Sequence, residues 1–240
     1  NKTLLAKMPA AYAPTGGGPT GLTHVRSFTG HFAFIPGWPP DRKGAAPFTP
    51  WANLNPGQTA HGYTVIGVTD GTSNTLVAAE SPALTEWTRP DELPFHDTAP
   101  ADFPGATLSP LPKLGGQFPG GFHGLMADGA VHFLPDTLAE TTLRALITVN
   151  AGEVIGPDAA AILNPPDPRK ASVPKEVPAT FADAAARRAA AANLSTLLKG
   201  MYDYHDHMSG LPAGVSAGNA VGLSWRVQIL PYIGEDALYK

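Results

Sequence analysis

The sequence contains no cysteine, which excludes disulfide bonds, thiolate metal sites and a cysteine nucleophile. Charged residues make up only 15% of the chain, against about a quarter in typical soluble domains. The formal net charge is -4, so no basic field attracts nucleic acid. No hydrophobic run approaches the roughly 20 residues that span a bilayer. We therefore expect no nucleic-acid partner and no membrane span in this chain.

Turn-forming residues are abundant instead. The 240 residues include 26 Gly and 26 Pro, which predicts many loops around one large domain or two small ones. A short helix is expected from Lys2 to Met8. A β-branched run from Tyr63 to Val68 predicts a strand, and the turn Asp70-Gly71 leads to a second strand at 75–79.

The clearest local signal lies at residues 125–134, where two apolar runs flank Asp128-Gly129. This pair tolerates positive φ at both turn positions, so a hairpin with a two-residue turn is expected. A helix follows it. Thr137 and Glu140 form a candidate capping box. The apolar face of this helix is formed by Leu138, Leu143, Leu146 and Ile147.

The second half of the chain changes character at residue 157. Residues 157–179 are rich in proline and predict a semi-extended linker between a sheet-rich body (1–156) and a final segment (180–240). This segment begins with a long helix, for which Thr180 is the candidate N-cap and Gly210 the end. Apolar residues recur along this helix at helical spacing and define one buried stripe: Leu194, Leu197, Leu198, Met201, His205 and Met208.

Two segments contain the residue types of a metal site. His205 and His207 lie two positions apart on a helix, so they point to different faces and cannot share one ion. Residues 70–75 resemble part of a calcium loop, but its twelfth position holds Ser81 instead of a bidentate acid. A turn whose side chains cap their own backbone is the commoner outcome, although calcium binding by Asp70 to Asn74 stays open. We expect no metal and no cofactor.

Signals of catalysis are weak throughout. The sequence has no G-x-S-x-G elbow, no phosphate-binding loop and no dinucleotide fingerprint. The carboxylates that could form a glycosidase pair are Glu80, Glu86, Asp91 and Glu92, with Glu80 and Glu86 as the first choice. They read more simply as solvated ends of a strand and a loop. We expect no catalytic residues. Two sequons make Asn1 and Asn193 candidate glycosylation sites, although the second falls inside a helix.

Several segments together resemble one bacterial family, the prepilin-like domain of unknown function with a prepilin-processing-associated H-x9-DG signature. The similar stretches are residues 1–9, 70–75, 86–90, 127–129, 142–147, 187–206 and 224–239, which include DGTSNT, TLRALI and SWRVQILPY. Phe118 stands where the signature has its histidine. The hydrophobic prepilin stem is replaced by Pro174-Lys175-Glu176-Val177-Pro178.

The order of the segments also departs from that family, because the half that comes late in the family precedes the early half here. The resemblance therefore implies either tandem domains sampled out of phase or a circularly permuted domain. It implies an α+β fold in which a pilin-like long helix packs on an antiparallel sheet with large Pro/Gly-rich loops.

Pattern and resemblance together predict a non-enzymatic subunit of an extracellular or cell-surface filament. An apolar stripe of this size cannot stay in water, so the long helix must either fold back on its own body or pack on the body of a neighbour. In the second case the copies would assemble head-to-tail by donating a segment to a neighbour. The expected interface consists of Leu194, Leu197, Leu198 and Met201, with Trp225 and Tyr232 as aromatic anchors. The alternative is an extracellular carbohydrate-binding module whose Trp38, Trp51 and Trp87 stack on sugars.

Overall fold

The computed structural model describes residues 2–15, 17–30, 35–36, 65–95, 110–164, 181–212 and 224–239. Six strands form its sheet: β1 (Leu22–Gly30), β2 (Ile35–Pro36), β3 (Leu76–Glu86), β4 (Leu93–Pro94), β5 (Gly121–Met126) and β6 (Val131–Pro135). Their order is β2-β1-β3-β5-β6, with β4 also paired to β1. The four longer strands pair antiparallel, whereas β2 and β4 run parallel to β1.

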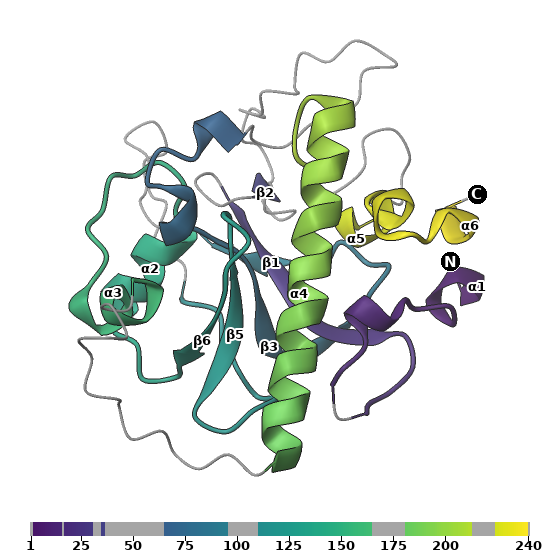
Figure 1. Ribbon diagram of the computed structural model, residues 1–240, viewed down its shortest axis with the longest axis horizontal. Helices are drawn as coiled ribbons and strands as arrows, with labels where there is room; N and C mark the ends of the chain where they lie inside the picture. The colour runs from purple at the N-terminus through teal and green to yellow at the C-terminus, as the bar shows by residue number, and fades with distance from the viewer. Residues whose placement is uncertain are drawn as a thin grey trace.

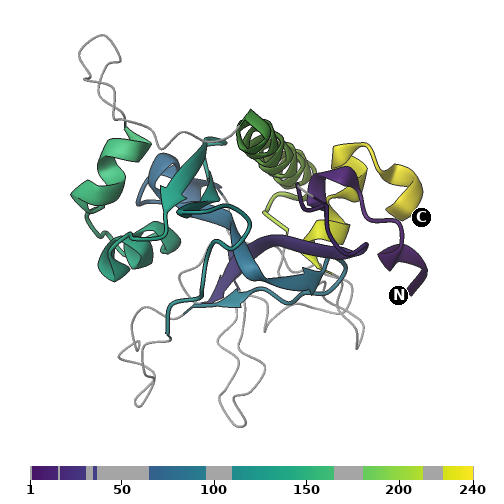
Figure 2. The same ribbon diagram turned by 90° about the horizontal axis from the view of Figure 1, so that it is seen from below.

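One long helix lies across this sheet (Figure 1). The α-helices are α1 (Lys2–Leu5), α2 (Glu140–Ile147), α3 (Pro157–Leu163), α4 (Phe181–Met208), α5 (Trp225–Gln228) and α6 (Asp236–Tyr239). Short 3-10 helices occupy Ala10–Tyr12 (η1), Val65–Gly67 (η2), Thr72–Asn74 (η3) and Leu230–Ile233 (η4). Figures 1 and 2 both place α1 next to α6, so the two ends of the chain lie on the same side of the molecule. The predicted α+β fold with a long helix on the sheet is confirmed. Within the described ranges, no helix is both long enough and apolar enough to cross a membrane.

The strands β3 and β5 are buried on both faces. Leu125 of β5 and Val77 of β3 belong to the cluster beneath α4. Phe122 and Met126 of β5 and Leu76 of β3 belong to a second cluster, which α2 and α3 complete. Because successive side chains of a strand point to opposite faces, a strand covered on both sides needs an unbroken apolar run. The residues from Leu76 to Ala79 supply it.

A bulge in β3 accommodates its proline. The register between β1 and β3 shifts between Thr23 and Val25, which pair with Thr85 and Glu80 respectively. Pro82 lies in the unmatched stretch, where a missing N–H costs no ladder hydrogen bond. The predicted strand at 75–79 therefore exists and extends further than expected.

The predicted hairpin between β5 and β6 is confirmed, but the prediction that its turn has two residues is wrong. The Gly129 N–H donates to Met126 O (3.1 Å) and the Met126 N–H donates to Ala130 O (2.8 Å), so the loop has three residues. Gly129 has φ +96°, while Asp128 is not in the left-handed region. This is the geometry of a turn closed by a glycine bulge, which needs positive φ at one position only.

Two other local predictions are wrong. Val65–Gly67 forms η2 instead of part of a strand, and Ile66 is 91% exposed. Thr137 does not cap α2; the Ala139 N–H and the Thr142 hydroxyl donate to the Asp158 carboxylate instead. These two bonds, the first the stronger cause, hold the pKa of that carboxyl below its usual range. Asp158 belongs to α3, which occupies the start of the expected linker. Residues 165–179 lie outside the described residues.

The glycine bulge generates a prediction. Gly129→Ala lowers the free energy of unfolding by about 1–2 kcal/mol, because an alanine at φ +96° is strained. Steric crowding does not add to this cost, since a Cβ there would lie 3.6 Å from the Leu198 side chain, an ordinary contact. Urea unfolding measures the change. Gly129→Asn, which tolerates this conformation better, is expected to cost less, and equal losses in both variants would contradict the assignment.

Candidate assembly interface

The predicted docking residues of α4 lie in the core of this same chain. Leu197 and Met201 are fully buried, and Leu194 and Leu198 nearly so. Burying four such side chains contributes roughly 6–12 kcal/mol, which is comparable to the net stability of a whole domain. Their cluster includes Tyr12, Val25, Val77, Ala78, Trp87, Leu125 and Ala127 from the body. The stripe that helical spacing predicts is thus one half of a shared core. Its role between copies stays a prediction.

The two aromatic anchors follow in the segment after α4. Trp225 is fully buried, and its ring lies edge-on to Tyr12 at a centroid distance of 6.5 Å. Tyr232 is half-buried and lies edge-on to Tyr204 of α4 at 5.7 Å. Trp225 therefore anchors the segment to the body, whereas Tyr232 anchors it to α4. We call residues 181–239 the helical module and residues 2–164 the body.

A buried ion pair joins the helical module to the body. The Arg226 guanidinium meets the Glu92 carboxylate in a bidentate arrangement, with Nη1–Oε1 at 2.6 Å and Nη2–Oε2 at 3.0 Å. Both side chains are essentially inaccessible to solvent, at 0% and 1% exposure. Such a pair is tolerated in a core only when all its remaining hydrogen-bonding groups are satisfied.

Those remaining groups are satisfied here. Arg226 donates from Nε and Nη2 to Val25 O (3.2 and 2.7 Å) and from Nη1 to the Ser224 hydroxyl (2.8 Å). All five guanidinium donors therefore have partners. Glu92 Oε2 also accepts the Ser27 N–H at 2.7 Å. The arginine thus binds β1 and the segment before β4 at once.

The backbone of Arg226 makes a further contact with the body. The buried Tyr12 hydroxyl donates to the Arg226 carbonyl at 2.9 Å. Burial raises the pKa of Tyr12 far above its ordinary value, and the nearby Arg226 charge offsets only part of this. The phenol is therefore protonated at neutral pH and can donate this hydrogen bond.

A second polar region lies beneath the first half of α4. The buried Glu80 carboxylate accepts the His123 N–H at 2.9 Å, and its Oε2 also lies 3.1 Å from His123 Nδ1. Glu80 Oε1 accepts from the Gln117 amide (2.9 Å), which also donates to the Thr15 hydroxyl (2.8 Å). Glu80 is therefore the hub of a polar network that crosses β3 and β5.

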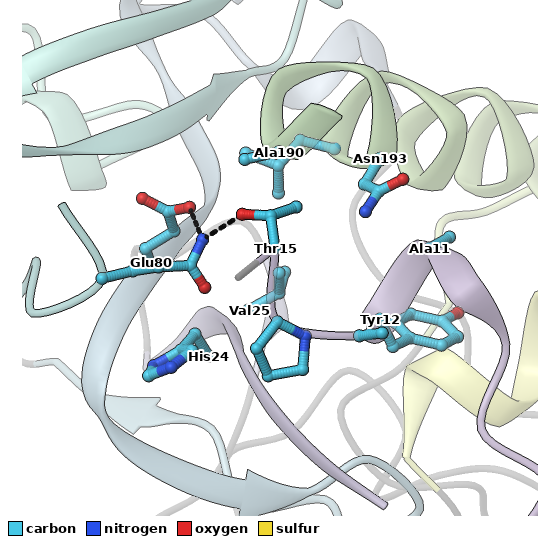
Figure 3. Close-up of a pocket in the computed structure, with 12 residues that line it drawn as sticks. Ala11, Tyr12, Thr15, His24, Val25, Glu80, Ala190 and Asn193 are labelled. Carbon is cyan, nitrogen blue, oxygen red and sulfur yellow. Dashed lines mark hydrogen bonds between the residues drawn. The ribbon is translucent and has the colours of Figure 1, made fainter. Parts of the chain in front are cut away.

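A small cavity opens beside this network (Figure 3). His24 and Glu80 line it from the sheet, and Ala190 and Asn193 line it from α4. Its volume of about 10 Å³ is that of roughly one water molecule. The cavity lies where the body and the helical module meet. It is too small for an organic substrate.

The predicted turn at Asp70-Gly71 has structural partners. Asp70 accepts the N–H groups of Ala151 and Gly152, each at 2.9 Å, through its two carboxylate oxygens. Asn74 donates to Asp70 O (3.1 Å) and Thr75 to Gly71 O (3.1 Å), as expected for a turn that caps its own backbone. Asp70 thus ties the loop before β3 to the loop after α2.

The histidine cluster of α4 has local partners too. His207 Nδ1 lies 2.7 Å from Asp203 O, and the Asp203 carboxylate pairs with Lys199 at 2.6 Å. In the part of the chain that the structure describes, no group of three or more His, Asp or Glu side chains is placed to hold a metal ion. The reading of Glu80 and Glu92 as solvated ends is wrong, because both are buried. Glu80 is bound by His123 and Gln117, and Glu92 is bound by Arg226.

The tryptophans predicted to bind sugars and the asparagines predicted to carry glycans differ in what the structure shows of them. Trp87 is fully buried, stacks on Tyr12 at 5.6 Å and donates to Leu5 O at 3.1 Å, so it offers no platform for a sugar. Trp38, Trp51 and Asn1 lie outside the described residues. Asn193 lies within α4, where its amide donates to Ala10 O at 3.4 Å. A glycan at Asn193 stays a prediction and would replace that contact.

Sequence reasoning missed Arg226 and Glu92 as an interface pair. They are 134 positions apart, and each resembles an ordinary surface charge in sequence. The one available signal was that Arg226 stands inside an otherwise apolar run, between Trp225 and Val227. A charge in such a run is either exposed or paired.

The helical module is also the part of the chain with a family match. Residues 182–240 are similar to the uncharacterised family SBP_bac_10, described as "Protein of unknown function (DUF1559)". No curated protein and no solved structure matches the chain. The match begins and ends close to the bounds of the helical module.

The buried ion pair generates a prediction. Glu92→Gln lowers the free energy of unfolding by about 3–5 kcal/mol, because it leaves the Arg226 charge buried without a counter-charge. Chemical unfolding measures the loss. Asp203→Asn, which breaks the exposed pair with Lys199, is the control and costs less than about 1 kcal/mol. Similar losses in both variants would contradict a central role for Arg226 and Glu92.

Proposed function

We propose that this protein is a non-enzymatic structural subunit of an extracellular filament, in which each copy donates its helical module to the body of the next. The observation that carries the proposal is the core shared between two segments of the chain. Leu197 and Met201 of α4 complete the cluster that contains Val77 and Leu125 of the sheet. Neither segment can bury its apolar surface without the other.

The connection between the segments is compatible with exchange between copies. Residues 165–180 separate Asn164 from Phe181, and such a stretch spans about 50 Å when extended. Exchange of an identical element needs no new contacts, because the donated module finds the same partners in a neighbour as in its own body. Only the connectivity changes. A contact of this type repeated head-to-tail builds an open filament.

The chemistry of the contact suits a permanent assembly. A donated module buries the apolar stripe of α4 and the Trp225 ring, and its Arg226 finds Glu92. Large apolar anchors around a fully paired charge are typical of tight interfaces. A mispaired module would leave that arginine buried without a counter-charge, which penalises wrong partners.

The proposed location rests on resemblance. The helical module is similar to an uncharacterised family, and we associate its sequence with prepilin-like surface proteins. Prepilin-like proteins act outside the cytoplasm, and a chain without cysteine needs no particular redox environment. We therefore place the filament outside the cell, with copies of this chain as its partner and glycans as a candidate modification.

Donation is tested by cross-linking between copies. Ala10→Cys is made in one chain and Asn193→Cys in another, since these residues touch where the body and the helical module meet and the chain has no other cysteine. The two variants are refolded together and treated with a short bis-maleimide. The expected product has twice the mass of one chain.

The controls separate exchange from chance contact. Ser195→Cys lies on the exposed face of α4, so its mixture with Ala10→Cys should give no product. The double variant Ala10→Cys/Asn193→Cys reports packing within one chain. If it alone cross-links and the mixture yields nothing, the helical module stays in its own body and the donation proposal is wrong.

A further inference from the structure

The first half of α4 cannot fix its own position on the sheet by apolar packing. Residues 184–192 consist of seven alanines and the pair Arg187-Arg188. Because alanine side chains are alike, sliding the helix by one turn would preserve most contacts in this half. Arg188 is exposed, whereas Arg187 is half-buried against the body. Arg187 is therefore the side chain in this stretch that distinguishes one register from another.

Arg187 packs on two aromatic rings of the body. Its guanidinium carbon lies 4.0 Å from the centroid of the Phe133 ring and 5.7 Å from that of Phe118. Its Nη2 donates to Pro119 O at a long 3.4 Å. Its Nε is buried without a hydrogen-bond partner among the described residues. The rings thus supply most of the attraction, through the cation–π contact that aromatic faces offer a guanidinium.

The two rings are held in place from below. Phe118 and Phe133 lie edge-on to each other, with centroids 6.5 Å apart. Each also lies edge-on to the His123 ring, at 5.0 and 5.2 Å. His123 in turn is bound by the buried Glu80. The Glu80 network therefore supports the rings, which form a preorganised slot between the edge strand β6, which carries Phe133, and the segment before β5, which carries Phe118.

We propose that Phe118 and Phe133 form an arginine slot that sets the register and selectivity of α4 on the body. This proposal rests on the donation described above, under which the slot takes Arg187 from a second copy. A guanidinium is planar and weakly hydrated, so it stacks on a ring more favourably than the compact lysine ammonium. The slot consequently selects arginine and not merely positive charge.

The test uses the full chain with a protease site placed between residues 170 and 176. The protein is folded, cleaved and diluted, and the concentration at which the helical module leaves the body is measured. Arg187→Lys, which keeps the charge, is expected to weaken retention roughly tenfold, consistent with loss of a desolvated cation–π contact. Arg188→Lys is the matched control on the exposed face and leaves retention unchanged.

A double-mutant cycle identifies the rings as the partner. In a Phe133→Leu background, Arg187→Lys should cost less than about twofold, because the stacking partner is already gone. Equal weakening in both backgrounds, or full retention with Arg187→Lys, would overturn the arginine slot. Because cleavage separates body and helical module whichever chain they came from, these outcomes do not depend on the cross-linking result. Failure of donation alone would leave the slot acting within one chain.

Discussion

The ion pair between Arg226 and Glu92 is the constraint on which the arrangement of this chain depends. Two charges taken out of water are stable only where they meet and where every remaining donor is satisfied. The pair meets that condition in one geometry, with the helical module seated on β1 and the segment before β4. The interaction therefore favours one docking pose over all others, more than it adds to net stability.

The two halves of α4 contribute different interactions to this arrangement. Its second half, from Leu194 onward, supplies apolar area to the shared core. Its first half is almost all alanine and lies over the Glu80 network, where Arg187 meets two aromatic rings. The buried apolar area contributes affinity but does not fix the orientation of the helix. The charged contacts bury little area but fix that orientation. A segment with both properties suits transfer between identical bodies, because it binds tightly and in one register.

Periodic features of the sequence predicted the parts of the fold that depend on neighbours along the chain. The stripe of α4 follows from helical spacing, and the hairpin of β5 and β6 follows from the apolar runs that flank Asp128-Gly129. Contacts between distant segments left no such pattern. Nothing local links Arg226 to Glu92, or Asp158 to the start of α2. The β-branched run before Val68 was misread because a strand needs a partner strand that sequence does not show.

The central claim is that the helical module completes the body of a neighbouring copy. Electron microscopy of the assembled protein tests it most directly, by tracing the chain between Asn164 and Phe181. Our account predicts filaments whose repeat matches one copy, with α4 of each copy lying on the next sheet. Isolated particles in which every α4 lies on its own sheet would contradict it.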